Sequence, residues 1–224
     1  MLTLRSIVVL AALLSLAGPA AAMPPSPGSF DPPRPTPSPR LTGYVIPVDA
    51  PLVLAFRNLP GAPREYRAGT HEGIDIAAPL GAPVRAARAG TIVRVDHAYL
   101  EWSFAERAFA LATAVGAGAT PAGILDRIRG RQVWIDHGDG VVTRYAHLSA
   151  VATGLEVGDP VDAGTSIGKV GASGLPEGGP HLHFEIRVRE SYLGEGLDPE
   201  DVRYLVARAF SPDVVKRECE STGR

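Results

Sequence analysis

The chain has 224 residues, a formal net charge of −2 at pH 7 and 45% hydrophobic residues. This length and composition suit one globular domain with additional segments. The near-neutral charge is untypical of nucleic-acid-binding proteins, which concentrate basic residues on one surface, so we expect no nucleic-acid partner. The single cysteine, Cys219, excludes an internal disulfide, so the fold must be stable without one.

The N-terminal segment has the composition of an export signal followed by a linker. Arg5 precedes an apolar stretch over 7–16 that is too short to span a bilayer comfortably, and alanines at 20–22 match a signal cleavage site. We therefore predict a signal peptide over 1–22, with no stable membrane span after its cleavage. The Pro-rich segment over 23–40 is predicted to be an extended linker. Export to the periplasm, the cell envelope or the extracellular space is expected.

From residue 41 onward, short apolar runs alternate with glycine and proline, which is typical of an all-β domain. Strands are predicted over 91–95, 133–136, 141–146, 166–170 and 181–188, and weaker strand patterns occur over 44–48 and 52–54. The dipeptide Asp139-Gly140 lies between two of these strands and is typical of a tight hairpin turn.

The segment over 98–130 departs from this β pattern. Leu100, Phe104 and Leu111 recur at helical spacing, which predicts a helix between residues 98 and 115. We expect this apolar stripe to pack against the β domain. The segment is therefore predicted to be a helical insertion between two strands.

Two further helices are predicted from their end signals. Thr120 followed by Pro121 is typical of a helix N-terminus, and Gly130 ends this short helix. Asp198 likewise precedes a proline and is predicted to start a last helix that runs to about residue 210. The predicted fold class is all-β, a mainly antiparallel sandwich or barrel-like domain with a two-helix insertion and a short C-terminal helix.

The strand over 181–188 carries two histidines in a strict alternation of polar and apolar residues. Side chains two residues apart on a strand share a face and lie about 7 Å apart, so His181 and His183 are expected on one face, with Leu182 and Phe184 toward the core. Two neighbouring imidazoles suit one metal ligand and one supporting or catalytic histidine. A surface strand that happens to carry two histidines is the alternative.

A second candidate segment contains His71, Gly73 and Asp75. In an extended chain these positions share a face, so His71 and Asp75 converge and Gly73 leaves room between them. Imidazole and carboxylate are good zinc ligands, and one histidine of the 181/183 pair would supply the third. Three protein ligands leave a fourth position for water, as in catalytic zinc sites. A turn with a solvated histidine and a capping aspartate is the alternative.

Tyr145 and His147 end the strand over 141–146 and are expected on one face. A structural histidine at a strand end is the alternative for His147 taken alone. His137, just before a tight turn, is interpreted as structural, and His97 as solvated.

Together these segments resemble the lysostaphin-like (LytM-type) zinc peptidases, over residues 68 to 190. The motifs that carry the resemblance, in chain order, are His71-x-Gly73-x-Asp75, Ile135-Asp136-His137-Gly138-x-Gly140, Thr143-x-Tyr145-x-His147 and Gly179-Pro180-His181-Leu182-His183-Phe184-Glu185.

The resemblance implies roles for five residues. It implies that one Zn²⁺ is bound by His71, Asp75 and His183, and that His147 and His181 assist catalysis. It also implies an antiparallel β fold with the metal at the floor of a groove. The implied activity is hydrolysis of peptide bonds in peptidoglycan stem peptides or cross-links by a zinc-activated water.

The insertion at about 98–130 departs from the family pattern, which has a short turn there. A lid, an arm that docks an envelope protein partner, and plain decoration are three interpretations of it. We expect a zinc peptidase domain over 41–190, with a C-terminal helix and tail over 191–224. Two alternative functions are a non-catalytic envelope regulator of a cell-wall hydrolase and a secreted peptidase that acts on proteins.

Overall fold

The computed structural model describes residues 41–210. The predicted signal peptide over 1–22, the Pro-rich linker over 23–40 and Cys219 lie outside the described residues. Within the described part of the chain, no helix combines the length and the apolar character that crossing a membrane requires.

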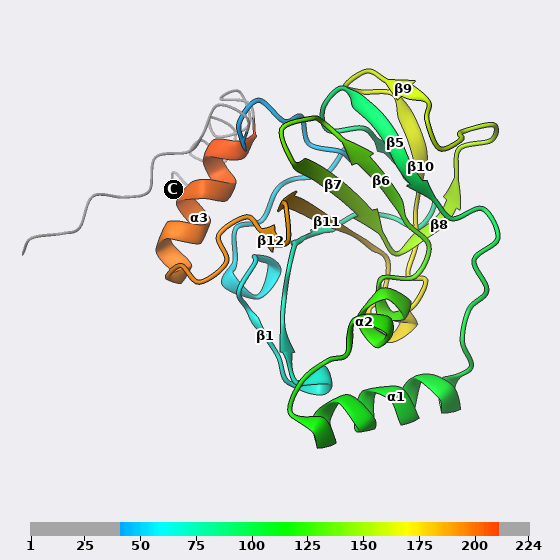
Figure 1. Ribbon diagram of the computed structural model, residues 1–224, viewed down its shortest axis with the longest axis vertical. Helices are drawn as coiled ribbons and strands as arrows, with labels where there is room; N and C mark the ends of the chain where they lie inside the picture. Colours follow the sequence, from blue (N-terminus) through cyan, green and yellow to red (C-terminus); the bar gives the residue numbers. More distant parts are fainter. Residues whose placement is uncertain (1–40, 211–224) are drawn as a thin grey trace, which may run out of the picture. The chain divides into compact units, whose positions relative to one another are not determined.

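The described chain forms twelve strands, most of them short, with three α-helices and short 3₁₀ turns between them (Figure 1). The strands are β1 (Pro63–Arg64), β2 (Gly69–Thr70), β3 (Ile74–Ala77), β4 (Pro83–Arg85), β5 (Gly90–Val95), β6 (Val133–Asp136), β7 (Val141–Ala146), β8 (Leu148–Val151), β9 (Pro160–Val161), β10 (Ser166–Val170), β11 (His181–Val188) and β12 (Ser191–Tyr192). The helical elements are η2 (Phe56–Asn58), η3 (Glu65–Arg67), α1 (Phe104–Ala117), α2 (Ala122–Arg129), η4 (Pro176–Gly178) and α3 (Pro199–Ala209).

The main sheet has the strand order β12-β11-β7-β6-β5-β9, and β3 joins it by pairing with β11. A second sheet has the order β4-β10-β8. The strand pairs within both sheets are antiparallel, which confirms the predicted fold class, although these strands do not close into a barrel. The β3–β11 register places Asp75 directly opposite His183 and so joins two segments that are far apart in sequence.

One face of β11 forms part of the core. Leu182, Phe184 and Ile186 are buried there, as the alternating pattern predicts. Phe184 pairs in register with Tyr145 of β7, and their ring centroids lie 5.2 Å apart. Phe210, just after α3, also packs against Phe184, with their ring centroids 6.1 Å apart. The opposite face of β11 is therefore left for polar side chains.

The strongest strand predictions are confirmed, whereas the two weak ones are wrong. No strand forms over 44–48 or 52–54. Tyr44 makes a single bridge to Phe210, and the rest of the segment is a loop that buries Val48 and Leu52 and exposes Val45 and Val53. Pro47 and Pro51 have no backbone N–H to donate to a ladder, so this apolar segment packs on the core without joining a sheet.

The first helix begins at Phe104, six residues later than predicted. Ser103 and Glu106 form a reciprocal capping box, in which the Ser103 Oγ accepts from the Glu106 amide at 3.2 Å and Glu106 accepts from the Ser103 amide at 2.7 Å. The predicted apolar stripe does not pack on the β domain. Leu100 precedes the helix and is 85% exposed, Phe104 is 72% exposed, and only Leu111 of the three is half-buried.

The start of the second helix also differs from the prediction. The N-cap residue of α2 is Pro121, not Thr120. The Thr120 hydroxyl instead donates to the Arg67 carbonyl and accepts a hydrogen bond of 3.1 Å from the Arg67 guanidinium. Its side chain therefore ties the α1–α2 connection to η3 rather than capping a helix.

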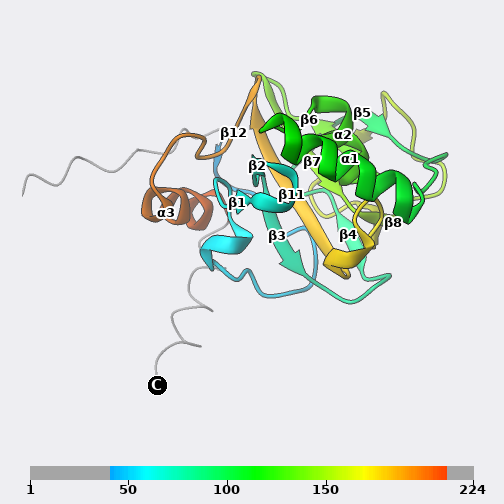
Figure 2. The same cartoon turned by 90° about the horizontal axis from the view of Figure 1, so that it is seen from below.

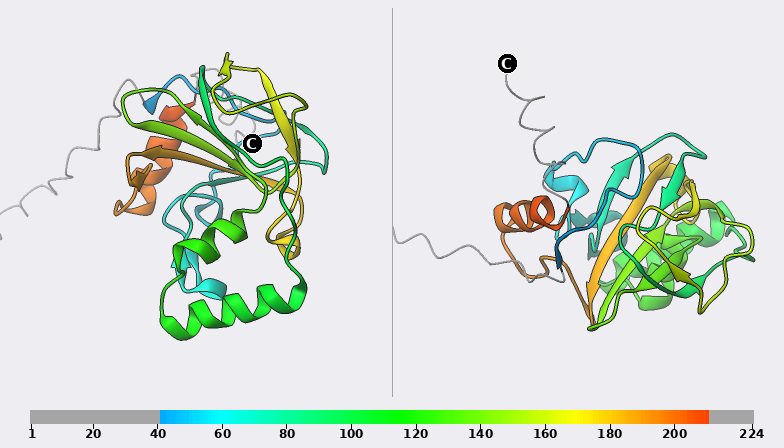
Figure 3. Two further views of the ribbon diagram at one scale, coloured as in Figure 1. Left: turned by 45° about the vertical axis from the view of Figure 1, so that its right-hand side comes forward. Right: turned by 90° about the horizontal axis from the view of Figure 1, so that it is seen from above.

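The insertion leaves and rejoins the main sheet at one place. Val95 and Val133 pair in register at the ends of β5 and β6, and the amide of Asp96 donates to the Gln132 carbonyl at 3.0 Å. The two helices thus stand where a hairpin turn would join these strands. Helix α1 contacts α2 within the insertion and η3 outside it (Figures 1, 2 and 3).

Candidate metal centre

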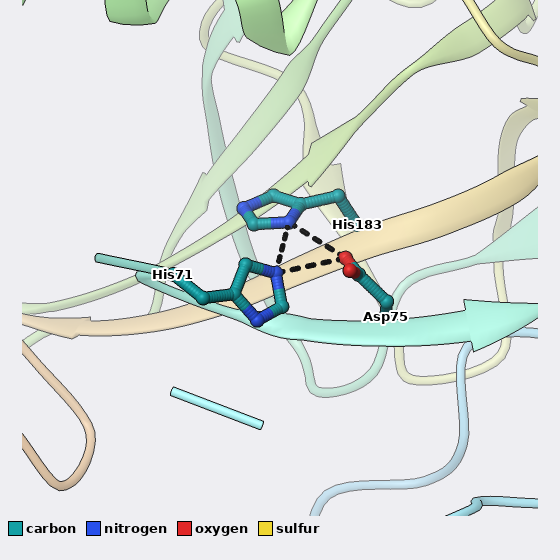
Figure 4. Close-up of side chains that lie close together, drawn as sticks. All are labelled: His71, Asp75 and His183. Atoms are coloured by element: carbon teal, nitrogen blue, oxygen red, sulfur yellow. Dashed lines mark hydrogen bonds and ion pairs between the residues drawn. The ribbon is translucent and has the colours of Figure 1, made fainter. Parts of the chain in front are cut away.

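Three predicted ligands meet at the junction of β3 and β11 (Figure 4). His71 lies in the loop before β3, and its Nε2 is 2.9 Å from Asp75 Oδ1 and 3.0 Å from His183 Nδ1. The third side of this triangle, from His183 Nδ1 to Asp75 Oδ1, is 3.0 Å. Strand pairing brings Asp75 and His183 together, and the bend before β3 adds His71.

Each of these side chains is oriented by a further hydrogen bond on its outer side. His71 Nδ1 donates to the Leu59 carbonyl at 3.0 Å, and His183 Nε2 donates to Glu185 Oε1 at 3.0 Å. Arg64 donates to Asp75 Oδ2 at 3.0 Å. Because a carbonyl and a carboxylate only accept, these contacts place the lone pairs of His71 Nε2 and His183 Nδ1 toward Asp75 Oδ1.

The donor set fits a single cation. Two imidazole nitrogens and one carboxylate oxygen converge, and three lone pairs at this separation repel one another unless a positive charge lies among them. Nitrogen and oxygen ligands of these types suit Zn²⁺. Gly73 makes the approach possible, because a Cβ there would lie 2.6 Å from the Phe184 carbonyl oxygen and 2.9 Å from His183 Nε2.

The titration behaviour of the three groups reflects the same crowding. Burial lowers the pKa of His71 to about 4, against the opposing effect of Asp75. Burial also disfavours a charged His183, but hydrogen bonds to Asp75 and Glu185 outweigh it and raise the pKa of this ring. The two histidines outweigh the effect of burial on Asp75 and hold its pKa well below the usual range. The centre therefore has a carboxylate at neutral pH and attracts positive charge.

The two predicted catalytic histidines lie beside this triad. The ring centroid of His147 is 4.7 Å from that of His181 and 5.7 Å from that of His183. His147 Nδ1 donates to the Ser173 carbonyl at 2.8 Å, and His181 Nδ1 donates to the Gly179 carbonyl at 2.9 Å. In the neutral tautomers fixed by these bonds, Nε2 of each ring is a proton acceptor. Burial lowers the pKa of His147 to about 3, so this ring is neutral at neutral pH.

The predicted common face of Tyr145 and His147 is wrong. Tyr145 is buried in the core, while Ala146 pairs opposite His183 on the site side of the sheet. If side chains continued to alternate between the two faces of the sheet, His147 would point toward the core, as Tyr145 does. The left-handed backbone of His147, with φ of 59°, breaks the alternation at the β7–β8 junction and directs the ring toward the other histidines.

All five predicted site residues line one cavity of about 430 Å³. Tyr66, Leu175 and Arg129 line other parts of the same cavity. His137 and His97 lie outside it. His137 bonds to the Ala89 carbonyl and the Thr143 hydroxyl, in keeping with a structural role, and the exposed His97 bonds to the Leu155 carbonyl.

Sequence reasoning missed the charged residues that surround the ligands. Glu185 is fully buried and accepts hydrogen bonds from His183 and Arg129. Its position two residues after His183, on the same face of a strand, was a usable signal. Glu72 and Arg129 offered no such signal, because their contact joins residues 57 positions apart.

Comparison with known proteins agrees with the motifs. The model of "Peptidase family M23" matches residues 104–195, a span that contains His147, His181 and His183 but not His71 or Asp75. The DD-carboxypeptidase/endopeptidase Mpg of Neisseria meningitidis serogroup B is 35% identical over 132 residues, which are 59% of this chain and 22% of that protein. The peptidoglycan DD-endopeptidase ShyA of Vibrio cholerae is 31% identical over 128 residues, which are 57% of this chain and 22% of ShyA.

The chain thus spans about a fifth of the length of these two relatives. Among solved structures, the catalytic domain of lysostaphin from Staphylococcus simulans is 25% identical, with 66% of this chain and 89% of that one covered and a TM-score of 0.43. The family resemblance carried by the motifs is therefore confirmed, because the match to peptidase family M23 and the two relatives point to the same family.

Proposed function

We propose that the protein is an exported zinc metalloendopeptidase that hydrolyses peptide bonds in peptidoglycan stem peptides or cross-links. The observation that carries this proposal is the convergence of His71, Asp75 and His183 in one cavity with two further imidazoles. The activity of ShyA, a peptidoglycan DD-endopeptidase, supports the substrate class.

In this proposal His71 Nε2, Asp75 Oδ1 and His183 Nδ1 hold one zinc ion. When bound, zinc would supply a Lewis acid that polarises the scissile carbonyl and lowers the pKa of water. The outer contacts of the ligands, from the Leu59 carbonyl and Glu185, preset the tautomers that metal binding requires.

His147 and His181 are proposed to move the protons. Each ring donates through Nδ1 to a backbone carbonyl, which leaves Nε2 as the nitrogen that can accept a proton from the attacking water. A ring that has accepted this proton becomes a donor for the carbonyl oxygen as it gains negative charge, or for the leaving nitrogen. Either histidine fits the role of base, and the two lie close enough to share it.

The proposed location is the cell envelope. The predicted signal peptide supports export. Two other relatives are lipoproteins, which supports this location: the uncharacterized lipoprotein YgeR of Escherichia coli, at 28% identity, and the outer membrane antigenic lipoprotein B of Haemophilus influenzae, at 32% identity.

The test is digestion of purified sacculi by residues 23–224 loaded with zinc, with the products identified by mass spectrometry. We expect a defined new peptide terminus that is absent with His147→Ala and retained with His97→Ala, the same substitution at an exposed histidine outside the cavity. His147→Ala should still bind zinc. A protein that binds zinc but releases no product would contradict the proposal and favour the non-catalytic regulator.

A further inference from the structure

We propose that the helical insertion is part of the framework of the metal centre, and that Arg129, the last residue of α2, is its positioning residue. Arg129 is 6% exposed and lines the cavity that contains the five histidine and aspartate side chains. The metal-binding part of this inference stands on the contacts of the chain, whereas its effect on turnover rests on the proposed function.

The first contact of Arg129 acts on the proposed ligand His183 through Glu185. Arg129 Nε donates to Glu185 Oε1 at 2.6 Å, and the same oxygen accepts from His183 Nε2 at 3.0 Å. The other two guanidinium groups near Glu185, from Arg144 and Arg187, lie at 3.5 and 3.4 Å from its second oxygen. Arg129 therefore makes the short charge-assisted bond that fixes the carboxylate orienting His183.

The second contact reaches the segment that carries the other histidine ligand. Arg129 Nη2 donates to Glu72 Oε2 at 2.7 Å, and Glu72 directly follows His71. The planar guanidinium of Arg129 thus joins the loop before β3 to strand β11, and Arg187 of β11 donates to the same Glu72 oxygen. A lysine cannot reproduce this, because its single ammonium lacks the fixed fork that meets two carboxylates at once.

The third contact involves the backbone and holds His147. The His147 amide donates to the Arg129 carbonyl at 2.8 Å. The next residue, Gly130, packs against Ser173 so closely that a Cβ would clash with the Ser173 carbonyl, and that carbonyl accepts from His147 Nδ1. The left-handed backbone at His147 is therefore supported by the turn that ends α2.

These contacts distinguish a positioning role from general packing. A buried guanidinium carries a desolvation cost that neighbouring carboxylates must offset, and an apolar side chain would fill the same space without it. Arg129 also lies in the last turn of α2, where a cation is favoured by the helix dipole. Through Arg129, the insertion therefore contributes to the orientation of both His183 and His147.

The experiment compares Arg129→Met and Arg129→Lys with Arg127→Met in the protein over residues 23–224. Arg127 lies two residues earlier in the same helix, is 50% exposed as a side chain and stacks on Trp102 at 4.5 Å. Zinc affinity is measured by competition with a chelator, the visible spectrum is recorded with Co²⁺, and kcat and KM are measured separately. Thermal unfolding without metal reports any general loss of structure.

Arg129→Met is expected to weaken zinc binding by about 10-fold, the lower end of the effect of outer partners on metal affinity. Its Co²⁺ spectrum should change, and kcat should fall more than KM rises. Arg129→Lys should recover part of the zinc affinity because it keeps one charge, and Arg127→Met should bind zinc as the wild type does.

A folded Arg129→Met protein with wild-type zinc affinity and Co²⁺ spectrum would overturn the inference. If that variant does not fold, Glu185→Gln removes the charge that Arg129 holds while keeping an acceptor for His183, and unchanged zinc affinity there would overturn it equally. A wild-type protein that binds zinc but cleaves no peptide would contradict the proposed function. The zinc affinities of the Arg129 variants would still test the role of Arg129.

Discussion

Tyr145 and His147 lie two residues apart in the chain, yet their side chains lie on opposite faces of the main sheet. The Tyr145 hydroxyl accepts from the Ala87 amide at 2.7 Å and from Thr143 at 3.1 Å inside the core. The His147 ring lies with its centroid 4.7 Å from that of His181 in the metal centre. The left-handed backbone at His147 places the two side chains on opposite faces. Tyr145 therefore contributes to the stability of the core, whereas His147 contributes to the metal centre.

Tyr145→Phe should therefore lower stability and spare the metal centre. Without the hydroxyl the buried Ala87 amide loses its acceptor, so the free energy of unfolding should fall by about 1–3 kcal/mol. Urea unfolding and zinc titration of the same sample check both parts. Weaker zinc binding in the folded Tyr145→Phe protein would show that the two faces are coupled.

Gly73→Ala should weaken zinc binding with little change in the rest of the fold. The added Cβ would lie 2.6 Å from the Phe184 carbonyl oxygen and 2.9 Å from His183 Nε2, so the His183 ring or the β3–β11 pairing must move. Gly116→Ala is the matched control, because a Cβ at Gly116 meets nothing within 4 Å. Equal zinc affinity in the two variants, measured by chelator competition, would contradict the proposed ligand geometry.

Zinc should raise the melting temperature, because an ion that binds only the folded chain stabilises it by mass action. At free zinc of 100 times Kd the gain is about 2.7 kcal/mol. For a domain of this size that corresponds to a rise of about 5–11 °C in Tm. Calorimetry with and without chelator measures it, and Asp75→Ala should abolish the rise. A Tm that does not respond to zinc would mean that no tight site exists.

Phe104→Ser should change the free energy of unfolding by less than about 0.5 kcal/mol, because the ring is 72% exposed. Phe184→Ala, in the core, should cost about 3–5 kcal/mol. Chemical denaturation of both variants makes the comparison. A large loss with Phe104→Ser would restore the expectation that the first helix of the insertion packs its apolar stripe on the β domain.

Local patterns in the sequence determined much of the framework. The period-two alternation over 181–188 correctly predicted a strand with His181 and His183 on one face, because strand geometry repeats every two residues whatever surrounds it. The Asp198-Pro199 signal correctly predicted the start of the last helix, because helix capping also depends only on residues that are close in sequence.

Tertiary structure alone decided which elements meet and how the site is held. The pairing of Asp75 with His183, the left-handed turn at His147 and the reach of Arg129 to Glu185 join segments that no local periodicity relates. The exposed Phe104 is a further example, because helical spacing predicts an apolar face of a helix but not whether another element packs on that face. Contacts between distant segments depend on the packing of the whole chain, and this packing brings the histidines together at one centre.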